Sequence, residues 1–135
     1  MGLAAWLLGI ENTTQIATHP LRGPLFENLA IAEVIKHRYN TVRTSNLSFY
    51  RDSSGLEVDL IHPLGNRLLP IEIKVGQTVT SSQIESLEKF TRLFPSQTAS
   101  PLLVHGGREE IPRGAIRAIP VRALVPRIRT LELTA

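Results

Sequence analysis

The spacing of hydrophobic residues changes along the chain from a helical period to a period of two and back again. Apolar side chains cover residues 25–38 almost continuously, and this spacing predicts a largely buried helix. From residue 47 the period is two, which is typical of strands whose side chains alternate between two environments. The alternation predicts three strands, over residues 47–51, 56–61 and 68–75.

A second helix and two further strands follow. Ser81 or Ser82 can cap a helix that runs to about Phe94. Apolar runs at residues 101–105 and 115–121 then predict two buried strands. Glycine and proline mark the connections between the predicted elements, which lie at residues 18–24, 52–55 and 63–66.

This order of helix, three strands, helix, strand and strand predicts a mixed α/β fold, in which a mixed sheet is flanked by helices. The sheet should begin antiparallel, and the second helix should cross over into the later strands. Residues 2–9 predict a short helix with an apolar face, which suggests a packing partner upstream in a longer chain. We expect a single domain, with an N-terminal helix and loop over residues 1–24, a core over residues 25–121 and a C-terminal tail over residues 122–135.

Composition narrows the class of protein. The chain has 135 residues, of which 42% are hydrophobic and 20% charged, and these values suit a globular protein with one core rather than a disordered segment. No apolar run approaches the roughly 20 residues of a membrane-spanning helix, so we expect no membrane partner. The absence of cysteine excludes disulfides and suits a reducing cytoplasm, where we expect the protein. A zinc site is disfavoured, because the four histidines are scattered at positions 19, 37, 62 and 105.

The basic and aromatic residues each allow two interpretations. The formal net charge is +3, and a basic surface favours nucleic acid as a partner because neutralising phosphates releases counterions. Spaced arginines also serve simply to keep a surface solvated, so charge alone leaves both interpretations open. Trp6 and the pair Phe49-Tyr50 could stack on bases, although burial in the core explains them more economically.

Charged residues alternate with apolar ones in two neighbouring predicted strands. Glu57 and Asp59 share one face of the first strand, and Glu72 and Lys74 share one face of the next. If these strands form a hairpin, the charged groups converge, and Glu27 on the preceding helix can reach the same patch. Carboxylates this close repel one another unless cations or protons neutralise them, and Mg²⁺ prefers oxygen ligands. The alternative is that these residues form the solvent face of an ordinary amphipathic sheet.

The same residues stand in an order that resembles a known family. Glu27, Asp59 and the segment Glu72-Ile73-Lys74 resemble the motif of the PD-(D/E)XK nuclease superfamily, which has the restriction-endonuclease-like fold. The resemblance is closer to a bacterial and archaeal domain of unknown function that usually lies C-terminal to an AAA+-type ATPase module. It covers Gly2 to about Val121 and is carried by four segments, LFEN at 25–28, FYR at 49–51, GLEVD at 55–59 and PIEIK at 70–74.

The resemblance implies a role for each matching residue. Asp59 would be the central metal-binding acid, Glu72 the second metal ligand and Lys74 the catalytic lysine. Glu27 would be a further catalytic and metal-binding residue that completes or supports the metal site. The cofactor would be Mg²⁺ or Mn²⁺. Accessory residues near the site would be Glu57, Arg51 and Gln83.

At the level of function, the resemblance predicts a metal-dependent nuclease domain that cuts phosphodiester bonds. DNA is expected as the substrate ahead of RNA, and the partner would be the ATPase module of the same parent chain. The sequence contains no Gly-x-x-x-x-Gly-Lys-Ser/Thr phosphate loop, so this chain should not itself hydrolyse ATP. Two alternatives remain open. The fold can serve without catalysis as a nucleic-acid-binding or regulatory domain of the ATPase, or the chain can be a plain interaction domain whose charged strands face solvent.

Overall fold

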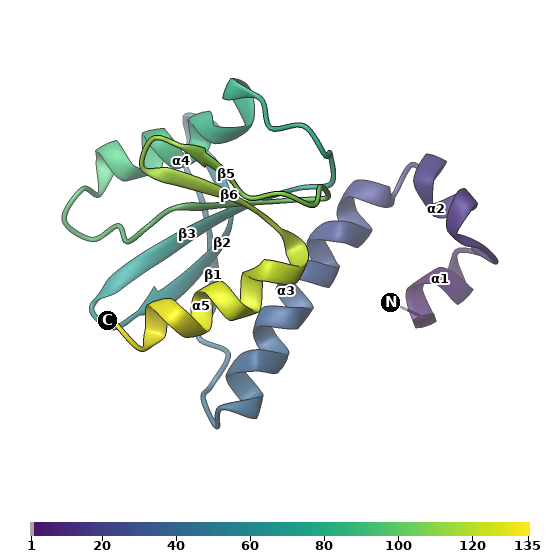
Figure 1. The fold of residues 1–135 in the computed structure, drawn as a ribbon, viewed down its shortest axis with the longest axis horizontal. Coiled ribbons are helices and arrows are strands. Elements are labelled where there is room, and N and C mark those ends of the chain that lie inside the picture. Colours follow the sequence, from purple (N-terminus) through teal and green to yellow (C-terminus); the bar gives the residue numbers. More distant parts are fainter. Residues whose placement is uncertain (1) are drawn as a thin grey trace.

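Helices and strands follow one another in the predicted order, with additions near both ends of the chain. The computed structural model describes residues 2–135 (Figure 1). The helices are α1 (Gly2–Leu7), α2 (Thr13–Thr18), α3 (Arg22–Asn40), α4 (Ser81–Leu93) and α5 (Leu124–Glu132), with a 3₁₀ turn, η1, at Val121–Ala123. The strands are β1 (Ser48–Arg51), β2 (Glu57–Leu64), β3 (Arg67–Lys74), β4 (Leu102–His105), β5 (Ile111–Arg113) and β6 (Ile116–Pro120).

The strands form one sheet in the order β1-β2-β3-β4-β6-β5. β2 pairs antiparallel with both β1 and β3, whereas β4 is parallel to both β3 and β6. β5 pairs antiparallel with β6 at the far edge. The helix α4 joins β3 to β4, because a parallel pair needs a crossover connection. The predicted mixed α/β class, with its antiparallel start, is confirmed.

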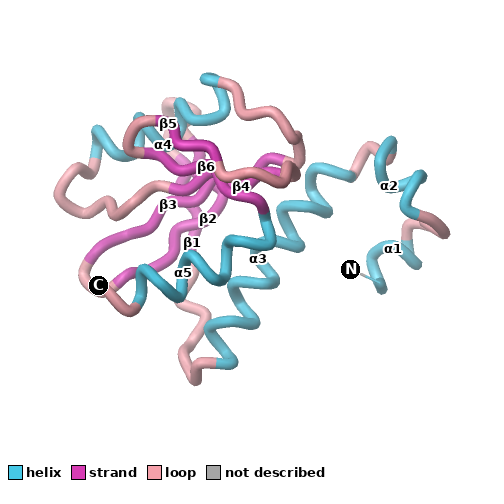
Figure 2. Tube along the Cα trace, viewed as in Figure 1, coloured by secondary structure: helices cyan, strands magenta, loops and turns pink. Residues whose placement is uncertain are grey.

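Helices cover both faces of the sheet, as the cyan helices beside the magenta strands show (Figure 2). α3 and α5 contribute to one buried cluster, to which Val34 and Ile128 belong. α4 contributes to the other, to which Leu87 and Phe90 belong. Burying each such side chain contributes roughly 1.5–3 kcal/mol. The two clusters therefore hold the central strands in a rigid frame.

The last segment, predicted as a tail over residues 122–135, is a helix that belongs to the core. Leu124 and Ile128 of α5 are fully buried in the cluster shared with α3. The helix α2 was also not predicted; its first turn is capped by Asn12, whose side chain accepts from the backbone N–H of Gln15. Helices of six to nine residues gain their stability mainly from packing and caps, so hydrophobic spacing alone does not reveal them.

Two prolines that were predicted to lie in connections, Pro24 and Pro63, lie inside a helix and a strand. α3 begins at Arg22 and takes in Pro24 in its first turn, where the backbone N–H groups have no partner within the helix. β2 continues through Pro63 to the end of the strand. Since β1 pairs with β2 only as far as Ile61, the missing N–H of Pro63 removes no ladder hydrogen bond on that side.

A bulge interrupts the pairing of β1 with β2. One residue of β1, Phe49, lies opposite two residues of β2, Asp59 and Leu60. Val58 belongs to the cluster under α4 and Leu60 to the cluster under α3, although residues two apart in a regular strand share a face. The extra residue therefore reverses which face of the sheet the following side chains of β2 point to, and bulges commonly change side-chain direction in this way.

The two aromatic residues of β1 lie in opposite environments. Tyr50 packs edge-on against Phe90 and Phe94, with ring centroids 5.2 and 5.7 Å apart. Phe49 is 69% exposed, and Trp6 on α1 is 75% exposed. Burial in the core is therefore the correct interpretation for Tyr50 and the wrong one for Phe49 and Trp6.

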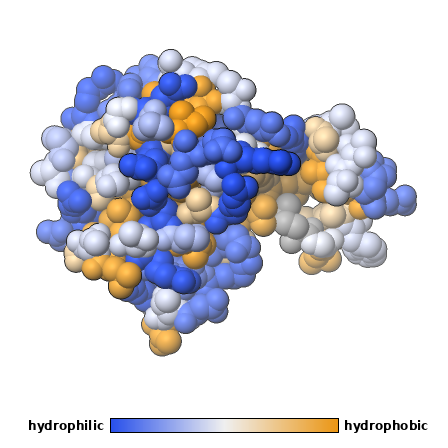
Figure 3. Space-filling view, viewed as in Figure 1, coloured by the Kyte–Doolittle hydropathy of each residue, from blue (hydrophilic) through white to orange (hydrophobic). Residues whose placement is uncertain are grey.

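The N-terminal helices α1 and α2 extend away from the sheet (Figure 1). Leu3 and Leu7 of α1 are both largely exposed, and apolar surface is visible on this part of the molecule (Figure 3). The predicted short apolar helix is thus present, with its apolar side chains in contact with solvent. Across residues 2–135, none of the helices combines the length and the apolar character needed to cross a membrane.

Candidate active site

The bulge in β2 places Asp59 against the backbone of β3. Its Oδ2 atom accepts a hydrogen bond from the backbone N–H of Ile73 at 2.7 Å. The last backbone pair between the two strands is Leu60 with Ile71, so beyond that point the side chain of Asp59 replaces the ladder. The carboxylate is therefore held at the point where β2 and β3 separate, next to the residues that flank Ile73.

Those flanking residues are Glu72 and Lys74. The Lys74 Nζ atom lies 2.5 Å from Glu72 Oε1 and 3.6 Å from Asp59 Oδ2. One ammonium group thus bridges two carboxylates from two strands. The three residues that were expected to form the centre of the site are brought together.

Glu72 is the most unusual member of this group. Its side chain is only 7% exposed, and its Oε2 atom is buried without a hydrogen-bond partner among the described residues. Leaving a buried polar atom unpaired costs about 1–3 kcal/mol, and more for a charged group. An unpaired buried polar atom of this kind requires an explanation, and a catalytic role or a bound water or ion are among the usual ones.

The electrostatic environment separates Glu72 from its neighbours. The pKa of Glu72 is raised to about 7, chiefly by burial; the ion pair with Lys74 opposes this rise and the charge of Asp59 adds to it. For Lys74, burial works to lower the pKa, but the hydrogen bond and charge of Glu72, together with Asp59, outweigh it and raise the pKa. At pH 7 Lys74 therefore stays charged, whereas Glu72 is divided between its protonated and its ionised form.

Glu27 approaches the same group from α3. Partial burial raises the pKa of Glu27, and the negative charges of Asp59 and Glu57 raise it further, while Lys74 lowers it. These effects place Glu27 within electrostatic range of the site. Its service as a third metal ligand stays a prediction.

The accessory residues are engaged elsewhere in this arrangement. Arg51 pairs with Glu57 at 2.7 Å, and both side chains are about half exposed or more. Gln83 belongs to the capping box of α4, in which its Oε1 atom accepts from the backbone N–H of Thr80 at 2.9 Å. Thr80, rather than the predicted Ser81 or Ser82, is therefore the cap, and the amide nitrogen of Gln83 remains on the side of Gly76.

The donor set suits a divalent cation of a particular kind. Within residues 2–135, no three histidine, cysteine or acidic side chains are grouped closely enough to hold a metal ion by themselves. Mg²⁺ usually binds through one or two carboxylates and takes its other ligands from water and substrate phosphate. Asp59 and Glu72 already flank one positive charge, and Glu72 Oε2 is free to accept another. These residues fit Mg²⁺ or Mn²⁺ as a two-carboxylate site.

Sequence reasoning missed His105 as a neighbour of this site. In the parallel pairing of β3 with β4, His105 stands beside Lys74. Its Nδ1 atom accepts from the backbone N–H of Gly107 at 2.9 Å, and its buried Nε2 atom has no partner among the described residues. Finding His105 requires the register between β3 and β4, two strands about 30 residues apart in the chain. The sequence pattern does not fix that register.

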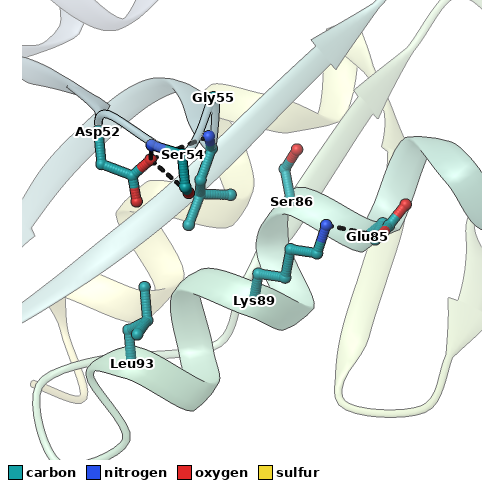
Figure 4. Close-up of a pocket in the computed structure, with 8 residues that line it drawn as sticks. Asp52, Ser54, Gly55, Glu85, Ser86, Lys89 and Leu93 are labelled. Atoms are coloured by element: carbon teal, nitrogen blue, oxygen red, sulfur yellow. Dashed lines mark hydrogen bonds and ion pairs between the residues drawn. The ribbon is translucent and has the colours of Figure 1, made fainter.

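Two hollows in the surface differ in their relation to the site. The larger, of about 490 Å³, lies between the β1–β2 turn and α4 (Figure 4), where Asp52 accepts from Ser54 and Lys89 pairs with Glu85. Its charged groups are thus already satisfied. The smaller, of about 270 Å³, has Asp59 on its wall and is therefore continuous with the candidate site.

The comparisons with known proteins assign a family. A family model described as "Domain of unknown function (DUF4143)" matches residues 22–124, a span that holds all the candidate site residues. This agrees with the closer part of the predicted resemblance, while the relation to PD-(D/E)XK nucleases stays a prediction. No curated protein and no solved structure matches the chain.

Proposed function

Because the chain belongs to the DUF4143 family of domains of unknown function, we propose on the basis of its site that it is a Mg²⁺-dependent nuclease domain. The observation that carries the proposal is Glu72, a buried carboxylate with one oxygen on Lys74 and the other unpaired. A purely structural ion pair gains nothing from an unpaired buried oxygen, whereas a cation site requires one.

The chain's own residues divide the work. Asp59, fixed by the N–H of Ile73, and Glu72 would hold the cation between β2 and β3. Bound Mg²⁺ supplies Lewis acidity toward a phosphoryl oxygen and lowers the pKa of water. Lys74 contacts both Asp59 and Glu72 through its ammonium group. From there this group can orient the attacking water and stabilise negative charge on the phosphate.

Residues around this centre support it. Glu27 on α3 lies within electrostatic range of this centre. Because the pKa of Glu27 is raised, a nearby cation would stabilise its ionised form. Arg51 lies on the exposed rim, in a pair with Glu57 that a phosphate group can replace. Phosphodiester bonds of a nucleic acid are the substrate that this combination of charges suits, and we keep DNA as the first candidate ahead of RNA. We further infer that the domain works beside the ATPase module of a parent chain.

One observation favours a second candidate function. Lys74 pairs with both Asp59 and Glu72, and the pKa of Glu72 is raised to about 7, so with Glu72 protonated the charge of the site is balanced without a cation. A domain that binds nucleic acid or regulates the ATPase without catalysis would keep this arrangement. Its nucleic-acid affinity would fall steeply with salt and would be the same, or better, in Asp59→Asn.

Cleavage of end-labelled single-stranded and duplex DNA in Mg²⁺ tests the proposal. Asp59→Asn and Lys74→Met should each lower the rate by about 100-fold or more, because each removes a group that acts on the reacting phosphate. Glu85→Gln is the matched control, since Glu85 pairs with Lys89 on the surface of α4. Cleavage at the wild-type rate in both site variants would contradict the proposal, and salt-sensitive binding without any cleavage would favour the second candidate.

A further inference from the structure

The exposed aromatic ring of Phe49 stands directly beside the candidate site. Phe49 lies on β1, the edge strand of the sheet, opposite the bulge that carries Asp59. It is 69% exposed, whereas its neighbour Tyr50 packs against Phe90 under α4. Single exposed apolar side chains are common on protein surfaces. What distinguishes Phe49 is that it lines a hollow in the surface together with Asp59.

The ring borders a shallow hollow that has two kinds of lining residue. Apolar side chains come from α3 and from the residue before β1, namely Ile31, Ile35 and Leu47. Ser45, Ser48 and Asp59 are the polar residues that line it. The hollow therefore combines apolar surface, hydrogen-bonding residues and a carboxylate of the proposed cation site.

We propose that this hollow binds an unpaired nucleobase next to the phosphodiester bond that is cut, with the base stacked on Phe49. The domain would then act on single-stranded nucleic acid or on a base displaced from a duplex. This inference rests on the proposed function, because Asp59 is what connects the hollow to the reacting phosphate.

Three features favour a nucleobase over an apolar peptide or a lipid chain. A base presents a flat apolar face together with polar edges, and the hollow offers an aromatic ring together with two serines. Its volume of about 270 Å³ is small for a peptide segment, and Asp59 is among its lining residues, a carboxylate that an acyl chain would avoid. The net charge of +3 also favours a polyanion over a neutral partner.

Binding of a short labelled oligothymidylate, followed by fluorescence anisotropy with Ca²⁺ in place of Mg²⁺, tests the inference without cleavage. Phe49→Ala should weaken binding by about 5- to 100-fold, because stacking on an aromatic side chain contributes about 1–3 kcal/mol per base. Phe49→Trp should restore it. Tyr39→Ala is the matched control, since Tyr39 is an exposed aromatic residue on α3 that does not line the hollow.

An abasic oligonucleotide of the same length separates stacking from charge. Wild-type protein should bind it as weakly as Phe49→Ala binds oligothymidylate. Equal oligothymidylate affinity in Phe49→Ala and wild type would overturn the inference and leave the hollow as a surface for a protein partner.

The failure of this inference and that of the proposed function give different results. Binding that depends on Phe49, in a protein that cuts no DNA in Mg²⁺, supports the hollow and removes the nuclease. Cleavage that depends on Asp59, with affinity and rate indifferent to Phe49, supports the nuclease and removes the base-binding hollow.

Discussion

Two buried carboxylates, Glu72 on β3 and Glu132 on α5, differ in how their oxygen atoms are paired. Both oxygens of Glu132 are paired, Oε2 with His37 Nε2 at 2.9 Å and Oε1 with Arg43 at 2.7 Å. Glu72 has one oxygen on Lys74 and the other unpaired. Both side chains are less than a tenth exposed, so the difference lies in the supply of partners and not in depth.

The surroundings of Glu132 explain its complete pairing. Glu132 belongs to a group of polar and titratable residues, here called the α5 cluster, whose other members are His37, Arg38, Arg43 and His62. The cluster ties α5 to α3 and β2, which are distant in sequence. A carboxylate with both oxygens paired holds a structure together, whereas an unpaired carboxylate oxygen is tolerated where a function uses it. Within the α5 cluster only the buried Nδ1 atom of His62 has no partner among the described residues. We therefore expect the α5 cluster to stabilise the fold and the group around Glu72 to serve the proposed chemistry.

The largest expected effect on stability comes from removing Glu132, the carboxylate whose two oxygens are both paired. Glu132→Ala should lower the free energy of unfolding by about 3 kcal/mol, because it leaves His37 without its partner in a buried position. The half-exposed Arg43 adds little to this loss. Urea denaturation measures it, with Glu110→Ala as the control for an exposed glutamate. A loss below about 1 kcal/mol would show that the α5 cluster does not stabilise the fold.

Acid should act on the same cluster. The pKa of His62 is lowered to about 4, chiefly by burial and then by the adjacent Arg38; His37 and Arg43 act in the same direction and Glu132 opposes them. The unfolded chain then binds a proton near pH 6.5 that the folded chain refuses, so stability is present above that pH and is lost as pH falls toward 4. We expect a loss of about 2 kcal/mol between pH 7 and pH 5. The raised pKa of Glu72 acts with the opposite sign over this range, so the test uses a Glu72→Gln background, from which that titration is removed. Urea denaturation should show the slope in Glu72→Gln, and adding His62→Gln should remove it; an equal slope in the two proteins would contradict the assignment.

Glu72 should respond with the opposite sign. Its pKa is raised to about 7, so its favourable contribution is present below about pH 4.5 and is lost as pH rises through 7. Glu72→Gln should therefore raise the free energy of unfolding by about 1 kcal/mol at pH 8, and the gain should vanish at pH 4.5. Thermal unfolding of both proteins at the two pH values measures it. A destabilised Glu72→Gln at pH 8 would place Glu72 with Glu132 as a structural carboxylate.

The smallest effect belongs to the exposed pair of Arg51 and Glu57. Arg51→Ala should change the free energy of unfolding by less than about 0.5 kcal/mol, because both side chains are open to solvent. If Arg51 contacts phosphate, the same variant should raise the KM for DNA and leave kcat close to wild type. A stability loss above 1 kcal/mol would assign Arg51 to the fold instead.

Much of the site was predictable, because strand period is a local property. The two-residue alternation places Glu72 and Lys74 together, and the hairpin brings Asp59 to them. The bulge was not predictable, since one extra residue in the β1–β2 pairing leaves no mark in the hydrophobic pattern, yet it exposes Phe49.

Contacts between distant segments were also beyond the sequence. The pairing of His37 with Glu132 joins residues 95 apart and depends on how α5 packs. An alternation of arginines and apolar residues in that segment is compatible with a solvated tail as well as with a helix. Local pattern thus predicted the candidate site better than it predicted the cluster that stabilises the domain.

Titration calorimetry with Mn²⁺ tests the central claim that the unpaired oxygen of Glu72 serves a cation. Wild-type protein should bind one Mn²⁺ per chain, Glu72→Gln should lose at least about tenfold in affinity, and Glu85→Gln should bind as wild type does. Mn²⁺ binding that is unchanged in Glu72→Gln, or absent from the wild-type protein, would contradict the claim.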